Sequence, residues 1–195
     1  MIQTLNSAVR HIPAWPIYIL TVAPLAYWIW QAQIGALGAE PIKTLEHKLG
    51  ELALQMLVVG LAITPLRRFL GLNLIKFRRA IGVTAFTLVA WHLLVWLILD
   101  VQILSQIWAD ILKRPYITVG MASFLILVPL VMTSNNLSIR KLGPTWRKLH
   151  KATYAAVLLG AVHFIMVAKG FQWEPIIYLL IIATLVGLRF VPKKS

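Results

Sequence analysis

Six long apolar stretches, separated by short polar segments, run along this chain of 195 residues. A transmembrane helix needs about 20 mainly apolar residues, and each stretch is close to that length. The predicted spans are residues 12–32, 49–66, 80–99, 116–133, 149–168 and 175–191. The second is the least regular, because Glu51 lies in its first turn. The pattern predicts an all-α membrane protein whose single domain, residues 1–195, is a bundle of six transmembrane helices.

The composition supports a chain that lies mostly in lipid. Hydrophobic residues make up 59% of it and charged residues only 13%, whereas soluble domains carry about 25% charged residues. No cysteine is present, which excludes disulfides, thiolate metal sites and iron–sulfur clusters. The first apolar stretch is longer than the core of a signal peptide and lacks a small-residue cleavage site, so we expect a retained helix.

The charges are divided unequally between the two sides of the predicted bundle. All six acidic residues fall on one side with five basic residues, and 14 basic residues fall on the other. The basic side carries Arg10, Arg67, Arg68, Lys76, Arg78, Arg79, Arg140, Lys141, Arg147, Lys148, Lys151, Arg189, Lys193 and Lys194. By the positive-inside rule this side, with both termini, is cytoplasmic. The formal charge of +13 therefore indicates topology and contact with anionic lipids, and we expect no nucleic-acid partner.

The longest outer segment, residues 100–115, has an amphipathic pattern. Apolar residues recur at helical spacing within it, at Ile103, Leu104, Ile107, Trp108, Ile111 and Leu112. Such a pattern is typical of a helix that rests on the membrane surface. A docking surface for an external partner is the alternative.

Two histidines lie deep in predicted spans, where ionisable side chains usually have a role. His92 and His163 stand 12 and 14 residues past the inner ends of their spans, at depths of about 18 and about 21 Å. Two neutral imidazoles at one level could bind one iron from opposite faces, as a haem between bundle helices requires. We expect small residues such as Gly82 and Gly160 to leave room for the porphyrin.

His150 lies nearer the cytoplasmic face, 13 residues before His163 and about 20 Å along the helix axis. That depth suits a second haem. Thirteen residues give a net rotation of about 220°, so the two histidines do not share a helix face. Either a π-bulge or kink near Gly160 corrects the rotation, or the two imidazoles face different neighbours.

The inner end of the third span offers no histidine to complete a second haem site. It carries Arg78 and Arg79, which are candidates for pairing with haem propionates or a flavin phosphate. Topology alone also explains these arginines.

Each histidine also has a simpler interpretation. A single intramembrane histidine is often an interhelical hydrogen-bond donor, and His150 fits an ordinary interfacial residue. His47 stands between Glu46 and Lys48 and is expected to be solvated. His11 is expected to flank the first span on the cytoplasmic side.

A set of short motifs, in order and at these spacings, resembles the MsrQ (YedZ) family. The motifs are Gly35-Ala-Leu-Gly-Ala-Glu-Pro-Ile-Lys43, His47, Gly50, Ile63-Thr-Pro-Leu66, Arg78-Arg79, Trp91-His92, Lys113-Arg114-Pro-Tyr116, Thr133-Ser134, Lys141-Leu-Gly143, Trp146-Arg-Lys-Leu-His150, Tyr154 and His163. They cover nearly the whole chain. The family comprises haem-binding membrane subunits of the bacterial methionine sulfoxide reductase system, and it is similar to the ferric reductase and NADPH oxidase membrane domains.

The resemblance implies a function and a set of partners. It implies one or two b haems in the bacterial inner membrane, with His92, His150 and His163 standing where the family's haem ligands stand. Electrons would enter from the quinol pool, with FMN as a candidate intermediate carrier. They would leave to MsrP, a periplasmic molybdopterin enzyme, so that sulfoxide reduction takes place on the partner and no catalytic residue lies on this chain.

Two other function classes remain open from the residues alone. A small transporter or channel subunit predicts inverted repeats or broken helices near the midplane, and the sequence shows neither. A cofactor-free assembly subunit predicts that the histidines are dispensable. The visible spectrum of the purified protein separates both classes from a haem carrier.

Overall fold

The computed structural model describes residues 2–191 of the chain, and those residues contain helices and turns but no strand. The predicted all-α class is therefore confirmed. In chain order the α-helices are α1 (Ile2–His11), α2 (Ala23–Gln33), α3 (Pro41–Leu70), α4 (Arg78–Val95), α5 (Leu104–Lys113), α6 (Pro115–Met132), α7 (Asn136–Leu142), α8 (Pro144–Leu149), α9 (Thr153–Val167) and α10 (Trp173–Gly187). Short 3₁₀ segments, η1 (Trp15–Thr21), η2 (Ile75–Phe77) and η4 (His150–Ala152), and a π-helical segment, η3 (Trp96–Val101), adjoin them.

Four helical segments are long and apolar enough to cross a membrane. They are Pro41–Leu70, Ile75–Val101, Pro115–Met132 and Pro144–Val167. A fifth crossing is present if α1 and the segment Trp15–Gln33, which are bent by 71°, count as one span. The apolar helix α10 is shorter, at 15 residues. The chain is thus a multi-pass membrane protein, and the count of six spans stays a prediction.

The second predicted span begins earlier and ends later than its hydropathy indicates. It is the 30-residue helix α3, which starts with Pro41 at its first position and ends at Gly71, whose φ is 72°. Proline is favoured at the start of a helix and a left-handed glycine at its end. Glu51 consequently lies inside the helix, where Gln55 donates a hydrogen bond of 2.8 Å to its carboxylate.

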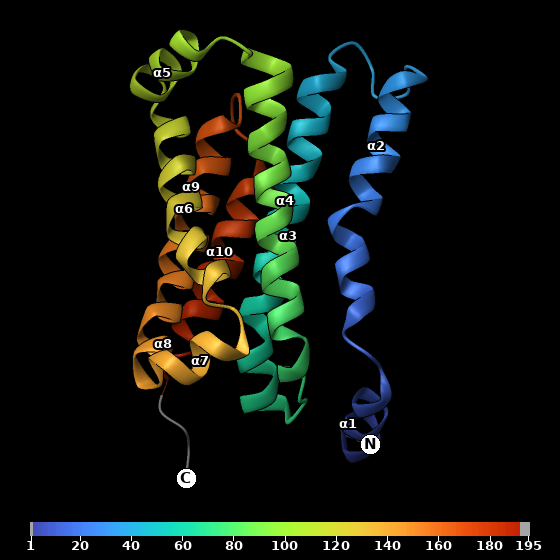
Figure 1. Cartoon of the computed structure of the whole chain (residues 1–195), viewed down its shortest axis with the longest axis vertical. Coiled ribbons are helices and arrows are strands. Elements are labelled where there is room, and N and C mark those ends of the chain that lie inside the picture. The colour runs from blue at the N-terminus through green and yellow to red at the C-terminus, as the bar shows by residue number, and fades with distance from the viewer. Residues whose placement is uncertain (1, 192–195) are drawn as a thin grey trace.

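The long helices stand side by side as one bundle (Figure 1). The bundle consists of α3, α4, α6, α9 and α10, and the segment η1–α2 packs against α4 and α3. Helix α5 lies across one end of the bundle, and α7 and α8 lie at the other end with α1 (Figure 1). Leu49, Leu61, Leu88, Val157 and Ile182 are fully buried between the helices.

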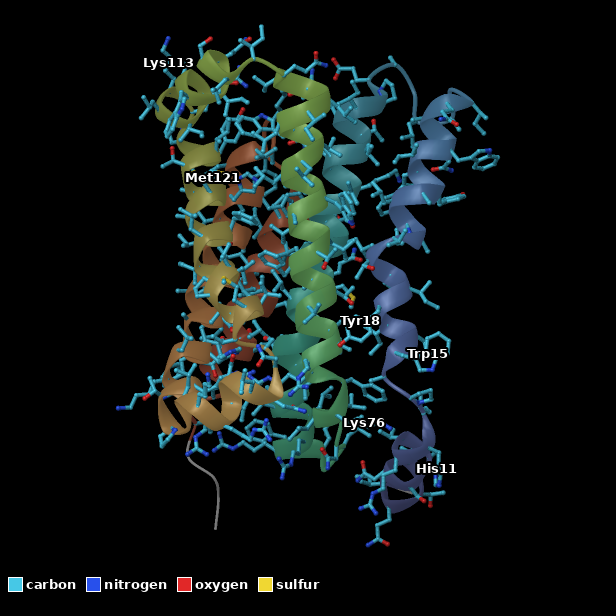
Figure 2. All side chains as sticks on the ribbon, in the orientation of Figure 1. His11, Trp15, Tyr18, Lys76, Lys113 and Met121 are labelled. Atoms are coloured by element: carbon cyan, nitrogen blue, oxygen red, sulfur yellow. The ribbon has the colours of Figure 1, made fainter. Side chains whose placement is uncertain are left out.

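Residues predicted to lie on opposite sides of the membrane are found at opposite ends of the bundle. Lys76 and His11 lie at the end that holds α1, and Lys113 lies at the opposite end (Figure 2). This matches the predicted separation of inner and outer residues. The cytoplasmic position of the termini remains a prediction, and Lys193 and Lys194, counted among the inner cations, lie outside the described residues.

Candidate functional site

His92 of α4 and His163 of α9 lie next to each other in the bundle. Their ring centroids are 6.1 Å apart and their ring planes meet at 79°. Both side chains are half-buried. The structure therefore brings together the two histidines that the sequence places at one depth.

Both imidazoles are oriented by backbone carbonyls of neighbouring helices. The Nδ1 of His92 lies 2.9 Å from the Glu46 carbonyl of α3, and the Nδ1 of His163 lies 2.8 Å from the Tyr116 carbonyl of α6. A carbonyl only accepts hydrogen bonds, so each Nδ1 carries the proton and donates it. Each Nε2 is then left with a free lone pair, which is the form of imidazole that binds metals.

The glycines beside the two rings differ from those expected from the sequence. The ring of His92 lies against Gly50 of α3, and the ring of His163 lies against Gly120 of α6. Gly160 instead faces Leu54 and Ser123, and Gly82 has no neighbour at the position where a Cβ would stand. The sequence indicates Gly50 only as part of the family pattern, and no pattern in it indicates Gly120.

His92 and His163 would be the residues to hold one haem iron between them. Metal–nitrogen bonds to imidazole are about 2.0 Å long, so two imidazoles on opposite sides of one metal have ring centroids roughly 6 Å apart. The observed 6.1 Å agrees with this value. Within residues 2–191 no group of three or more histidine or acidic side chains could hold a bare metal ion, whereas a porphyrin supplies four of the six iron ligands itself.

His150 occupies a different environment at the other end of α9. Its Nε2 lies 3.0 Å from the Thr133 hydroxyl, and its ring stacks on Trp146 with the centroids 3.9 Å apart. Across the described part of the chain it pairs with these two residues rather than with a second histidine. A second ligand for an inner haem is therefore not apparent from the contacts.

The irregularity predicted near Gly160 lies elsewhere. Gly160 is inside the regular helix α9, whereas His150 opens the 3₁₀ turn η4 just before that helix. A 3₁₀ turn advances by about 120° per residue instead of about 100°. The two imidazoles face different neighbours, as the second alternative predicts: His150 contacts Thr133 and Trp146, whereas His163 contacts Tyr116 and His92.

The two candidate arginines of α4 point to different partners. Arg79 donates a hydrogen bond of 2.7 Å to the Asn136 side chain. Arg78 lies close to Arg189, Tyr154 and His150. Arg189 was not a candidate from the sequence, yet it donates a hydrogen bond of 2.8 Å to the Tyr154 hydroxyl.

The remaining histidines have no such environment. His47 is exposed on α3. His11 is also exposed, and its Nδ1 lies 3.0 Å from the carbonyl of Ser7 in its own helix. Among the described residues, neither ring stacks on, or meets edge-on, the ring of His92 or His163.

Comparison with known proteins identifies relatives along nearly the whole chain. A family model described as "Ferric reductase like transmembrane component" matches residues 49–161. An Agrobacterium fabrum protein is 44% identical over 185 residues, which is 93% of this chain and 86% of that protein. A Brucella ovis protein is 45% identical over 179 residues (90% and 81%), and one from Brucella anthropi is 43% identical over 178 residues (91% and 81%). Each carries the name "Protein-methionine-sulfoxide reductase heme-binding subunit MsrQ", and no solved structure matches.

Proposed function

This chain belongs to the MsrQ family, and from that premise we propose that it carries electrons across the bacterial inner membrane on haem b. The electrons enter from the quinol pool, with FMN as a candidate intermediate carrier. They leave to the periplasmic molybdopterin enzyme MsrP, which reduces methionine sulfoxide in envelope proteins. In this proposal the chain is the electron-transfer subunit, and catalysis takes place on the partner.

The observation that carries the proposal is the His92–His163 pair. The two imidazoles have ring centroids 6.1 Å apart, and each Nδ1 is held by a carbonyl, which supports the proposal that they are the ligands of one haem iron. A bound haem supplies a reversible one-electron iron couple. The chain's own residues orient the imidazoles, and buried apolar side chains, such as Leu49 beside Gly50 on α3 and Val95 one turn after His92 on α4, exclude water.

The position of the pair along the bundle supports delivery to an outer partner. Glu46 and Tyr116 lie in the first two turns of α3 and α6. These helix starts lie at the end of the bundle where α5 lies (Figure 1), which is the predicted outer side. An electron held there has a short path to a periplasmic protein.

We also retain His150 as the candidate ligand of a second, inner haem. Arg78 lies near it and is the better of the two arginine candidates for a propionate or a flavin phosphate, because Arg79 is bonded to Asn136. Haem-to-protein stoichiometry of the wild-type chain and of His150→Ala decides this point. If the wild-type chain binds one haem per protein and His150→Ala binds the same amount, the hypothesis of an inner haem is wrong.

The visible spectrum of the purified protein tests the main proposal. We expect a sharp reduced α band in the wild-type chain and its loss in His92→Ala and in His163→Ala. His11→Ala is the matched control, since His11 is exposed and lies at the end of the bundle opposite Lys113 (Figure 2), and it should keep the band. A folded but colourless wild-type protein, produced with an adequate haem supply, would instead favour a transporter or a cofactor-free subunit.

A further inference from the structure

A Cβ on either glycine beside the imidazoles would stand closer to the ring than ordinary van der Waals contact allows. A Cβ placed on Gly50 would lie 3.0 Å from Nδ1 and 3.2 Å from Cε1 of His92. A Cβ placed on Gly120 would lie 2.9 Å from Nδ1 and 3.0 Å from Cε1 of His163. Neither glycine has a positive φ, so backbone conformation does not require glycine at either position. The requirement is for space.

The same arrangement occurs on two different helices. The carbonyl that accepts from His92 belongs to Glu46, four residues before Gly50, and the one that accepts from His163 belongs to Tyr116, four residues before Gly120. Residues four apart lie on one face of a helix, one turn from each other. Each imidazole therefore passes over the glycine, where no Cβ stands in its way, and reaches the carbonyl of the residue one turn earlier.

Close approach of the helices does not explain these glycines. At both positions the three nearest atoms to the missing Cβ all belong to the histidine ring. Elsewhere in the same bundle, Gly60 and Gly160 would place a Cβ at ordinary contact distances of 3.5 and 3.8 Å from other side chains. Glycine costs about 1 kcal/mol relative to alanine inside a helix, so its presence at both ring contacts needs a specific reason.

We propose that Gly50 and Gly120 are positioning residues that seat the two imidazoles so that both Nε2 atoms face one iron. This proposal rests on the proposed haem function. In each half of the site the glycine sets how far the ring approaches its helix, and the carbonyl one turn earlier sets its rotation. A methyl group at either glycine pushes the ring away and strains or breaks the Nδ1 hydrogen bond.

Alanine substitution tests the proposal with matched controls. Gly50→Ala and Gly120→Ala should weaken haem binding about tenfold to a hundredfold, the range found when partners that orient metal ligands are lost. In the haem that remains, the electron paramagnetic resonance signal and the midpoint potential should shift. Gly60→Ala on α3, the helix that carries Gly50, and Gly187→Ala on α10 should change none of these values, because a Cβ there has ordinary contacts or open space.

The outcomes separate this inference from the proposed function. A wild-type chain without haem would contradict the proposed function. A haem-loaded wild type whose Gly50→Ala and Gly120→Ala variants match the controls would overturn the role of the glycines. If Gly50→Ala fails to fold, the His92→Gly background should restore folding, because it empties the space that the Cβ needs. Failure to restore it would also overturn the proposal.

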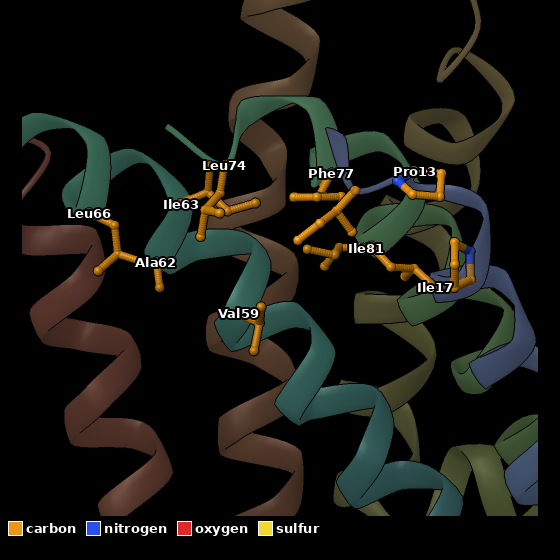
Figure 3. Close-up of a pocket in the computed structure, with 11 residues that line it drawn as sticks. Pro13, Ile17, Val59, Ala62, Ile63, Leu66, Leu74, Phe77 and Ile81 are labelled. Atoms are coloured by element: carbon orange, nitrogen blue, oxygen red, sulfur yellow. The ribbon is translucent and has the colours of Figure 1, made fainter. Parts of the chain in front are cut away.

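A second observation, independent of the histidines, concerns an apolar cavity between the N-terminal segment, α3 and the start of α4 (Figure 3). The cavity has a volume of about 420 Å³, and Pro13, Ile17, Val59, Ile63 and Phe77 are among its walls. Every residue that lines it is apolar. Ligand sites of this size usually include a few polar groups that fix a ligand's orientation, so this cavity suits a hydrocarbon chain rather than a ring bearing carbonyls or carboxylates.

The residues next to the cavity are cationic. The Lys76 ammonium donates a hydrogen bond of 2.9 Å to the Arg10 carbonyl and lies 5.0 Å from the ring centroid of Phe77, which lines the cavity. Asn6 of α1 donates a bond of 3.0 Å to the Gly71 carbonyl, so α1 is attached beside the opening. The ion pairs within residues 2–191 are Lys43–Glu40 and Arg114–Asp110, and neither involves Arg10 or Lys76.

We infer that one acyl chain of an anionic phospholipid occupies this cavity, with its headgroup at Arg10 and Lys76. An apolar cavity beside cations fits the two parts of such a lipid, and anionic lipids are attracted to basic segments on the cytoplasmic face. The lipid then fills the space between the N-terminal segment and the bundle. The inference does not depend on haem binding.

Native mass spectrometry of the protein in nanodiscs tests the lipid. We expect the wild type to retain phosphatidylglycerol in preference to phosphatidylcholine. Ala62→Phe should reduce retention because Ala62 lines the cavity, and the pair Arg10→Gln with Lys76→Gln should abolish the preference. Leu125→Phe, at an exposed position on α6, is the control. Equal retention of both lipids, no effect of Ala62→Phe, or recovery of a quinone in place of the lipid would each overturn the inference.

Discussion

At the scale of single residues, polar groups in the bundle are satisfied by specific partners. The buried hydroxyl of Ser123 in α6 donates a hydrogen bond of 2.8 Å to the Ala156 carbonyl in α9. Ala156 and Ala161 are also buried at this interface. Small residues let membrane helices approach closely, and a hydroxyl between them needs a protein partner because lipid offers none.

Substitution of Ser123 should therefore destabilise the α6–α9 interface. Ser123→Ala removes one interhelical hydrogen bond and should cost about 0.6 kcal/mol. Ser123→Leu adds volume to a closely packed contact and should cost about 1–3 kcal/mol. Reversible unfolding in mixed micelles measures both values against Leu125→Ala, which changes an exposed side chain of the same helix. A Ser123→Leu variant as stable as this control would show that the interface is loosely packed.

The histidines could be predicted from the sequence and their glycines could not. His92 and His163 lie in apolar stretches, so their depth follows from counting residues along each helix. Gly50 and Gly120 act on rings from other helices, and this depends on how each helix is rotated about its axis. Hydropathy gives no such rotation for α4, α6 and α9, which are apolar on all sides.

At the scale of secondary-structure elements, the proline inside α3 has a compensating partner. Pro65 has no N–H, so the carbonyl of Leu61, four residues earlier, loses its usual helical hydrogen bond. The Arg189 side chain donates to that carbonyl at 2.8 Å. The segment after α10 is thereby attached to α3, and the Arg68 side chain adds a bond to the Leu188 carbonyl of 3.3 Å.

A double-mutant cycle tests the link between Pro65 and Arg189. Arg189→Gln leaves the Leu61 carbonyl unpaired and should cost about 1–3 kcal/mol in the wild-type background. In Pro65→Ala the helix regains its own donor for that carbonyl, so the same substitution should cost about 1 kcal/mol less. The free energies of unfolding of the four proteins give this coupling. Additive effects would show that Arg189 does not compensate for the proline.

The first predicted span contains a break that hydropathy does not predict. Residues 12–32 are apolar enough to read as one helix, but the structure contains η1 followed by α2, with α1 bent away by 71°. Pro16 and Pro24 are the second residues of these two segments. Proline suits the start of a helix and interrupts its interior, so two prolines this close together favour two short segments over one continuous helix.

At the scale of the whole molecule, the charge pattern predicts which end of the bundle faces the cytoplasm, whereas hydropathy does not. Helices α7 and α8, which carry Arg140, Lys141, Arg147 and Lys148, lie at the opposite end of the bundle from α5 (Figure 1), and all six acidic residues are predicted to lie on the α5 side. The fold requires these ends to lie on opposite sides of a membrane, and only the positive-inside rule says which is which. The proposed direction of electron flow depends on that orientation, because the His92–His163 pair lies nearer the α5 end.

The absence of cysteine from the sequence permits a direct test of orientation. Ser105 in α5 and Thr145 in α8 are exposed at opposite ends of the bundle, and each can be replaced singly by cysteine with no background thiol. A membrane-impermeant maleimide added to intact spheroplasts should label Ser105→Cys fully and leave Thr145→Cys unlabelled until the cells are lysed. The unsubstituted chain, which cannot react, is the control. Labelling of Thr145→Cys alone would place the haem pair toward the cytoplasm, and a route from the quinol pool to a periplasmic reductase would then need a second redox centre beyond it.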